Sequence, residues 1–356
     1  MNILYFSTKK RWGGVVTWMK KTAHGLEAKG YKVFIISHPN CKIVEDKDLN
    51  VVKLKPGFEF NPFTIFKLVY FIKKNKIDLI VTNIRKEVSF GGIAAKICGI
   101  PNVRRIGTDT DFDNKNGKYY SLVDYVISPC QQMIDSVLVK HKYLSNLPMI
   151  CIYNGRNLLD FNEDDRKTLR KDYKISDNSF VLGVNCQLIK IKNVDGIINV
   201  FKKVVNKHPN VVLVIAGTGN LESLLRRRVE DDNLRNSCFI LGHTKDAFKL
   251  PLIYDISILF SNAEGFSNSV VEYMAASSPV ICTDVGGQKE IVINGETGFL
   301  IERENEDMLY DRVSELIENP QLREKFVENS RKLMKEKFSE DIMIDKLEKL
   351  YGDLSK

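Results

Sequence analysis

Two glutamates, Glu264 and Glu272, flank a short turn, and their surroundings predict a ligand site. Residues 256–261 are apolar and predict a buried strand before the turn, and the residues after the turn predict a helix. Free backbone N–H groups at a helix start favour a phosphate. A carboxylate one helical turn further on accepts hydrogen bonds from sugar hydroxyls. Together, these groups suit a nucleotide sugar.

The same residues also fit a purely structural interpretation. Ser269 to Glu272 matches a capping box, in which Glu272 only caps its own helix. Glu264 would then be an ordinary solvated loop acid. The spacing alone leaves both interpretations open, and the elements around the two acids decide between them.

Apolar strands alternate with helical segments along the whole chain, which predicts an α/β fold with two doubly wound parallel sheets. In the first half, strands are expected at 2–7, 31–37, 77–82, 102–106, 125–128 and 149–153, and helices at 15–29, 63–74, 89–98 and 131–140. In the second half, strands are expected at 180–184, 211–216, 238–241, 256–261, 280–283 and 299–301, and helices at 194–207, 221–228, 305–318, 322–335 and 340–351. The polar stretch 160–178 predicts the connection between two domains.

Ligands bind outside the carboxyl ends of the strands in such sheets, so two domains imply a cleft between them. Glycine turns fall at those ends, as Gly13-Gly14 in one half and as Gly217-x-Gly219 and 284–287 in the other. Glycine lets a backbone approach a ligand where a side chain would intrude.

Composition is ordinary for a globular protein, since 44% of the 356 residues are apolar and 28% are charged. The sequence holds no uncharged apolar run of about 18 residues, which would predict a membrane-spanning helix. We see no secretory signal, and the seven scattered cysteines include no C-x-x-C pair. A cytoplasmic protein with reduced thiols is therefore expected.

Charge is unevenly distributed along the chain. Residues 1–150 hold 24 basic against 12 acidic residues, a net charge of +12, while the remainder has −4. Segment 61–76 adds aromatic residues to a lysine-rich end, which favours peripheral contact with an anionic membrane at the inner face of the cell. The alternative is a core helix whose terminal lysines complement its dipole. We find no pattern typical of nucleic-acid binding, so no nucleic-acid partner is expected.

These motifs resemble those of retaining glycosyltransferase family 4, which has the GT-B fold, and the resemblance covers essentially the whole chain. Its densest part is the paired-glutamate signature from Glu264 to Glu272 with its continuation through residues 274–300. Residues 213–219 are similar to the family's glycine turn, residues 152–161 to its segment leading into the second domain, and Gly13-Gly14 to its early glycine loop.

The resemblance implies a role for each matching residue. Glu272 would bind the ribose hydroxyls and Glu264 the donor sugar, while backbone N–H groups near Ser269 would hold the diphosphate that Lys192 neutralises. The implied donor-binding residues are Gly13, Gly14, Gln187, Lys192, Gly217, Gly219, Glu264, Phe266, Ser267, Asn268, Ser269, Val270 and Glu272. Glu264, Lys192 and Asp109 are the candidates for residues near the reaction, with Asp109 toward the acceptor.

The resemblance further implies an acceptor-binding domain at 1–160, a nucleotide-sugar domain at 161–338, and a last helix, about 339–356, that packs back on the first domain. The expected activity is transfer of a sugar, from a UDP-sugar by preference, to a glycan or lipid-linked acceptor with retention of configuration. Synthesis of cell-surface polysaccharide or lipopolysaccharide is the expected setting. A helix start and basic side chains would stabilise the departing diphosphate, so no metal or cofactor is expected.

Two departures from the family pattern are visible. Gln187 stands where the family usually has an arginine, and no histidine follows strand 102–106, where many members have one. Lys192 with Lys190, or another base such as Arg156, would then have to supply the missing charge. An inactive nucleotide-sugar-binding scaffold is the alternative function, whereas an epimerase of the same fold would lack the paired glutamates.

Overall fold

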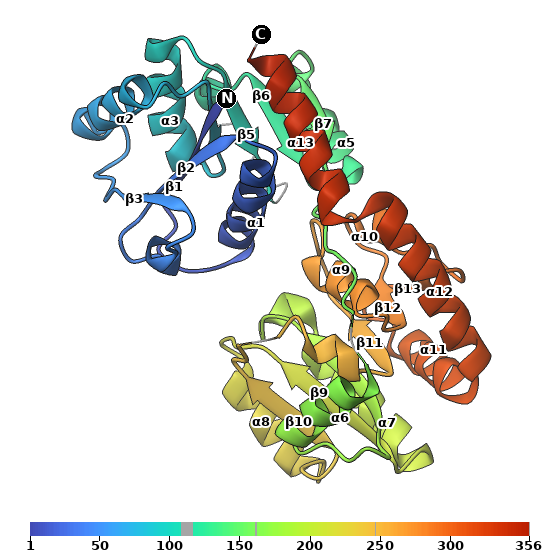
Figure 1. The fold of residues 1–356 in the computed structure, drawn as a ribbon. Helices are drawn as coiled ribbons and strands as arrows, with labels where there is room; N and C mark the ends of the chain where they lie inside the picture. The colour runs from blue at the N-terminus through green and yellow to red at the C-terminus, as the bar shows by residue number, and fades with distance from the viewer. Residues whose placement is uncertain (108–116, 161, 246, 356) are drawn as a thin grey trace. The chain divides into compact units, whose positions relative to one another are not determined.

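The computed structural model describes residues 1–107, 117–160, 162–245 and 247–355. The chain divides into two compact units, one of residues 1–155 with 340–356 and the other of residues 156–339 (Figure 1). The sequence placed the corresponding boundaries at 160/161 and 338/339. In the described parts of the chain, every helix is too short or too polar to span a bilayer.

The first unit is a seven-stranded parallel sheet with helices on both faces. Its strands, in spatial order, are β3 (Asn50–Lys53), β2 (Lys32–Ser37), β1 (Asn2–Ser7), β4 (Leu79–Thr82), β5 (Asn102–Arg105), β6 (Tyr125–Ser128) and β7 (Met149–Cys151). Its helices are α1 (Gly14–Ala28), α2 (Pro62–Lys74), α3 (Arg85–Cys98), α4 (Gly117–Tyr120), α5 (Gln131–Lys140) and α13 (Glu340–Leu354).

Alternate residues of β1 face the two covering layers of this sheet, because side chains alternate along a strand. Ile3 and Tyr5 point into a core shared with α1 and α13, whereas Leu4 and Phe6 point into a core shared with α2 and α3. The last helix therefore packs against the first strand of the chain, with Tyr351 fully buried in the same core as Tyr5.

The second unit is a six-stranded parallel sheet. Its order is β10 (Cys238–Gly242), β9 (Val211–Ala216), β8 (Phe180–Asn185), β11 (Ile256–Leu259), β12 (Val280–Thr283) and β13 (Gly298–Ile301). Its helices are α6 (Glu163–Asp172), α7 (Val194–Lys207), α8 (Glu222–Asp231), α9 (Asn268–Ala275), α10 (Gln288–Ile291), α11 (Glu306–Glu318) and α12 (Pro320–Lys337).

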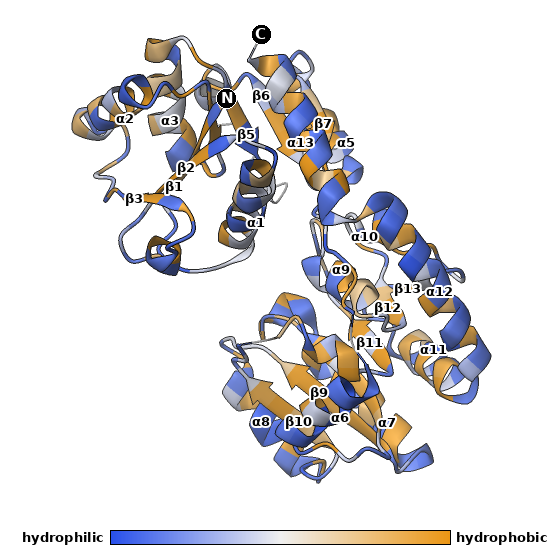
Figure 2. Ribbon diagram, in the orientation of Figure 1, coloured by the Kyte–Doolittle hydropathy of each residue, from blue (hydrophilic) through white to orange (hydrophobic). Residues whose placement is uncertain are grey.

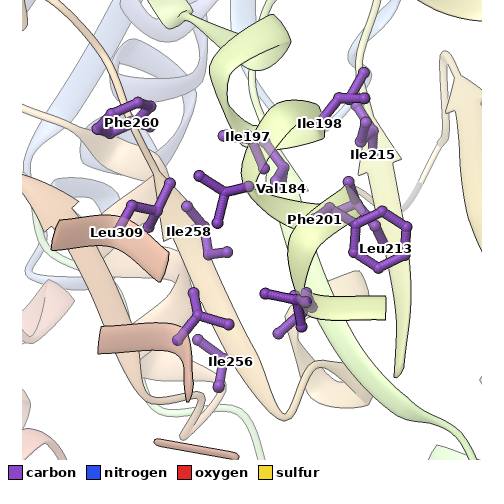
Figure 3. Packing of buried hydrophobic residues seen from close by; sticks show 14 of the residues in the cluster. Val184, Ile197, Ile198, Phe201, Leu213, Ile215, Ile256, Ile258, Phe260 and Leu309 are labelled. Atoms are coloured by element: carbon purple, nitrogen blue, oxygen red, sulfur yellow. The ribbon is translucent and has the colours of Figure 1, made fainter. Parts of the chain in front are cut away.

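A large core of the second unit lies between its sheet and helices α7, α8, α11 and α12. Figure 3 shows Phe201 of α7 and Leu309 of α11 among aliphatic side chains of β8, β9 and β11. The strands appear as apolar bands between helices of mixed character in Figure 2. This pattern is what a sheet buried on both faces requires.

Local structure differs from the sequence pattern at three places. The polar connection at 160–178 contains α6, a helix without an apolar stripe; Asn162 and Asp165 cap it reciprocally, and buried Arg170 donates to the carbonyls of residues 176, 177 and 179. Helix α3 begins four residues before the predicted start because Glu87 accepts from the Asn83 and Ile84 N–H groups. The edge strand β3 is short and largely exposed, and the sequence pattern missed it.

Candidate functional site

A cavity of about 300 Å³ lies at the carboxyl edge of the second sheet. Its walls come from the ends of β8, β9 and β10 and from the first turns of α9: Asn185, Cys186, Gln187, Ala216, Gly217, Thr218, His243, Thr244, Ala247, Ser269 and Glu272. The strand order reverses between β8 and β11, since β9 and β10 lie on one side of β8 and the later strands on the other. The cavity thus occupies the switch point at which such sheets bind ligands.

Glycines of the turn after β9 let two loops approach each other at this edge. A Cβ atom on Gly217 would lie 1.8 Å from the Cys186 carbonyl oxygen, and one on Gly219 would lie 2.1 Å from that of Leu188. Gly217 also has φ of +141°, which other residues rarely adopt. The Leu188 N–H donates to the Thr218 carbonyl, which joins the loops directly. Both glycines are therefore required by packing of the cavity wall.

A second glycine turn supports the loop that carries Glu264. Gly286 has φ of +58°, and a Cβ atom on it would lie 2.0 Å from the Glu264 carbonyl oxygen. The Gly287 N–H donates to the Gly265 carbonyl at 2.7 Å. Residues 284–287 thereby hold the backbone of the glutamate loop in place.

Helix α9 begins at a different residue from the one the capping-box interpretation needs. Its N-cap is Ser267, whose hydroxyl accepts from the Val270 N–H, and the Ser269 hydroxyl instead donates to the Asn185 carbonyl. The structure therefore excludes the capping box at Ser269 and Glu272. Asn268, Ser269 and Val270 form the first turn of α9, where backbone N–H groups lack partners within the helix.

The two glutamates each pair with a base far away in the sequence. Lys192 Nζ lies 2.5 Å from Glu264 Oε1, and Arg156 Nη2 contacts Glu272 Oε1. Neither carboxylate is a free loop acid, because the Glu264 side chain is only 9% exposed and that of Glu272 20%. The paired cations are also shielded from solvent, since the Lys192 side chain is 18% exposed and that of Arg156 20%.

Several predicted residues thus come together in the second unit, and others do not. Gln187, Gly217, Ser269 and Glu272 line the cavity, whereas Lys192 and Glu264 pair with each other and are not among its lining residues. Phe266 does not line it; its ring packs 6.4 Å from that of Phe338.

The predicted residues of the first unit are described within that unit alone. Helix α1 begins at Gly14, and Gly13 is extended, with nothing within 4 Å of a Cβ atom built on it. Packing therefore does not require a glycine at position 13, unlike position 217. Asp109 lies outside the described residues.

Sequence reasoning missed four polar residues of the cavity: Asn185, Thr218, His243 and Thr244. Each lies at or just after the carboxyl end of a strand, so position alone could have indicated them. The Cys186 thiol beside them is inert, because burial raises its pKa to about 12. All seven cysteines are free thiols. Within the described residues, no three acidic, histidine or cysteine side chains are grouped as a metal site would need.

The basic pair Arg104-Arg105 makes its contacts inside the first unit. Both side chains are buried at the end of β5, where the Arg105 guanidinium stacks over the Trp18 ring and donates to Asn154. In the second unit, Arg226 and Arg228 pair with neighbouring acids. These arginines serve the fold of each unit.

The protein has the GT-B architecture, defined by two doubly wound domains with a switch-point cavity in the second. A similar solved structure is that of HepE from Anabaena in complex with UDP, with a TM-score of 0.87 and 20% identity over 99% of this chain and 100% of HepE. The family model described as glycosyl transferases group 1 matches residues 165–333, and that described as glycosyl transferase 4-like matches residues 2–136. The chain belongs to these group 1, family 4-like glycosyltransferases.

Curated relatives extend over most of the chain. The capsular polysaccharide biosynthesis glycosyltransferase CapM of Staphylococcus aureus is 28% identical over 314 residues, which are 82% of this chain and 81% of CapM. The UDP-Gal:alpha-D-GlcNAc-diphosphoundecaprenol alpha-1,3-galactosyltransferase of Escherichia coli is 25% identical over 309 residues, which are 82% of this chain and 79% of that enzyme.

Proposed function

We propose that this glycosyltransferase moves a sugar from a UDP-sugar to a glycan or lipid-linked acceptor of the cell surface, with retention of anomeric configuration. The observation that carries the proposal is the switch-point cavity with Glu272 on its wall and the Lys192–Glu264 pair beside it. The UDP and UDP-glucose complexes of HepE support the choice of donor. The capsular polysaccharide role named for CapM and the UDP-Gal donor and diphosphoundecaprenol-linked acceptor named for the galactosyltransferase support the choice of donor and acceptor.

In this proposal, the cavity holds the nucleotide and the start of α9 holds the diphosphate. Glu272 accepts hydrogen bonds from the ribose hydroxyls, and the N–H groups of the first turn of α9 face the phosphate oxygens. When the donor binds, the Lys192 ammonium contacts both Glu264 and the diphosphate. Glu264 then accepts from the donor sugar, close to the reacting carbon.

The chemistry needs no side chain as a nucleophile. The bond from the anomeric carbon to the diphosphate oxygen breaks, and the acceptor oxygen bonds to that carbon on the same face. The acceptor proton passes to the departing diphosphate oxygen. Fixed positive groups stabilise the charge that develops there, which is the largest effect available to such a site.

Arg156 supplies the positive charge that Gln187 lacks. Arg156 lies in the segment of the chain between β7 and β8, and its guanidinium contacts Glu272 on the cavity wall. An arginine at that position can offset the phosphate charge by itself, because a guanidinium donates hydrogen bonds to two phosphate oxygens at once. The metal independence of the reaction is part of the proposal.

The test is thermal stabilisation by UDP, GDP and ADP and their sugars, each with and without EDTA, because a ligand that binds only the native state raises the Tm. A shift with one diphosphate and its sugar, unchanged by EDTA, is expected. Turnover of that sugar is then measured for Glu264→Ala, whose kcat should fall more than its donor affinity. The proposal fails if no nucleotide raises the Tm.

An inactive donor-binding scaffold is the second candidate, because a neutral amide, Gln187, lines the cavity where an arginine is usual. The two candidates differ in one result. A scaffold binds the donor, and neither hydrolyses it nor transfers its sugar to any lipid-linked or glycan acceptor offered. Product formed with the anomeric configuration of the donor, read by proton NMR coupling, would exclude the scaffold.

A further inference from the structure

Helix α2 of the first unit has two apolar faces, and only one of them is buried. Leu68 and Ile72 pack into the core with α3. Phe63, Phe66 and Tyr70 lie three and four residues apart, so they share the opposite side of the helix. The sequence could not tell which face was used, because both are apolar.

The exposed side forms one feature with the loop before it. We call Phe58, Phe60, Phe63, Phe66 and Tyr70 the aromatic face. Phe58 is 72% exposed, Phe63 76% and Phe66 71%. Single exposed apolar residues are normal, but five aromatic residues within 13 positions mark an interaction surface.

Lysines surround the aromatic face. Lys67, Lys73, Lys74 and Lys76 are exposed, the Lys74 ammonium lies 5.8 Å from the centre of the Tyr70 ring, and no acidic residue occurs between positions 60 and 77. A second copy of this chain would bring the same lysines against one another, so the charge opposes self-association. Exposed aromatic side chains with lysines around them complement an anionic bilayer surface. The aromatic rings enter the headgroup region, and the lysine ammonium groups contact the lipid phosphates.

We propose that the aromatic face binds the interface of a bilayer containing anionic lipid. Phe58 and Phe60 belong to the loop after β3, at the carboxyl edge of the first sheet, and Glu59 in that loop pairs with Arg85 at the start of α3. Docking therefore brings the ligand-binding edge of this sheet to the lipid. The inference deepens the proposed function, because a lipid-linked acceptor lies in such a surface, and it is tested without turnover.

The experiment is co-sedimentation of the full chain with vesicles of phosphatidylcholine alone or mixed equally with phosphatidylglycerol. The wild type should bind the mixed vesicles. Phe63→Ser with Phe66→Ser should weaken the partition at least about tenfold, since both rings lose their apolar contact. Lys73→Gln and Lys74→Gln should each weaken it about fivefold, and more at low salt than at high salt.

Leu224→Ser in α8 is the matched control, since Leu224 is 61% exposed in the second unit and should leave the partition unchanged. Circular dichroism and Tm verify the fold of each variant. Phe66→Trp provides an independent reading, because its emission should shift to the blue on mixed vesicles only. An equal partition of the double variant and the wild type would overturn the inference, as would a lipid-free dimer that the double variant loses.

The outcomes separate this inference from the proposed function. Vesicle binding without any nucleotide-induced Tm shift supports the aromatic face and rejects the UDP-sugar donor. A Tm shift with UDP and no vesicle binding rejects the aromatic face and leaves the donor site.

Discussion

The switch points of the two sheets differ: a cavity lies at one, and a buried side chain occupies the other. In the second sheet, a cavity of about 300 Å³ lies between the ends of β8 and the start of α9, and Glu272 stands on its wall. In the first sheet, a fully buried carboxylate, Glu87, occupies the space between the ends of β1 and β4. Its oxygens accept from the N–H groups of Thr8 at 2.6 Å and Asn83 at 2.9 Å.

This contrast explains why the two halves of the sequence differ in what they reveal. Gly217, Gly219 and Gly286 are pressed against neighbouring carbonyls, so the backbone alone requires glycine at these positions. A Cβ atom built on Gly13 has no neighbour within 4 Å, so packing does not require glycine there, whereas the close approach of a ligand would.

The largest expected effect separates Gly217 from Gly13. Gly217→Ala forces a Cβ atom into the Cys186 carbonyl at a positive φ, which should destabilise the second unit by about 3 kcal/mol or more. Gly13→Ala should leave the free energy of unfolding within about 0.5 kcal/mol of the wild type. Urea denaturation of both variants measures the difference.

Turnover sharpens the same comparison. If the donor comes close to Gly13, as the family resemblance implies, Gly13→Ala should lower kcat while the Tm stays constant. Equal stability losses in the two variants would mean that the glycine of the first unit is also structural, and the contrast would fail.

The second effect concerns the role of a carboxylate at each switch point. Glu272→Ala should weaken UDP binding by about 2 kcal/mol, because a charged acceptor for the ribose hydroxyls is lost. Titration calorimetry with UDP measures it. Glu87→Gln serves as the control, since a buried structural carboxylate in the other unit should leave UDP affinity unchanged. If Glu272→Ala binds UDP as the wild type does, Glu272 only holds Arg156 in position.

The sequence predicted many of the residues around the cavity, but it did not predict which side chains contact one another. The strands and glycine turns were predictable because buried parallel strands and tight turns leave local signals. The Arg156–Glu272 pair joins residues 116 positions apart, and no local pattern encodes such a contact. The alternative capping box at Ser269 would start the helix two residues too late, and the sequence left it open because Ser267 and Ser269 both fit an N-cap.

Other features escaped because the pattern was ambiguous or absent. Both sides of α2 are apolar, and only the packing of Leu68 against α3 distinguishes the buried side from the exposed one. Helix α6 depends on caps and on Arg170 rather than on an apolar stripe, and periodicity cannot detect it.

The third effect is a pH dependence confined to the first unit. Burial raises the pKa of Glu87 above the ordinary value of 4.5. Its protonated form therefore favours the folded state, and this contribution is complete below the ordinary pKa and is lost as pH rises through the raised pKa. Glu87→Gln should cost about 1.5 kcal/mol in mild acid, and the cost should shrink as pH rises.

Denaturant midpoints of wild type and Glu87→Gln between mild acid and neutral pH measure this gap. A gap that widens with rising pH would mean that the hydrogen bonds from Thr8 and Asn83 outweigh burial and lower the pKa. The Glu272→Ala variant provides the contrast, since its main effect should be on ligand affinity.

The smallest effect tests how the second unit replaces a missing charge. Gln187→Arg adds a guanidinium to the cavity wall, which should tighten UDP binding by about 1 kcal/mol if the diphosphate lacks a partner there. UMP is the control ligand, because it lacks the second phosphate and should gain less.

The same substitution made with Arg156→Gln shows whether the two arginines share one role. If Arg156 already supplies the charge, Gln187→Arg alone changes UDP affinity little, Arg156→Gln weakens it, and the double variant returns to the wild-type affinity. Additive effects in this double-mutant cycle would instead mean that the two positions contact different parts of the ligand. Arg156 would then not replace the arginine that the family usually has at position 187. In that case, we expect normal donor binding together with a low kcat.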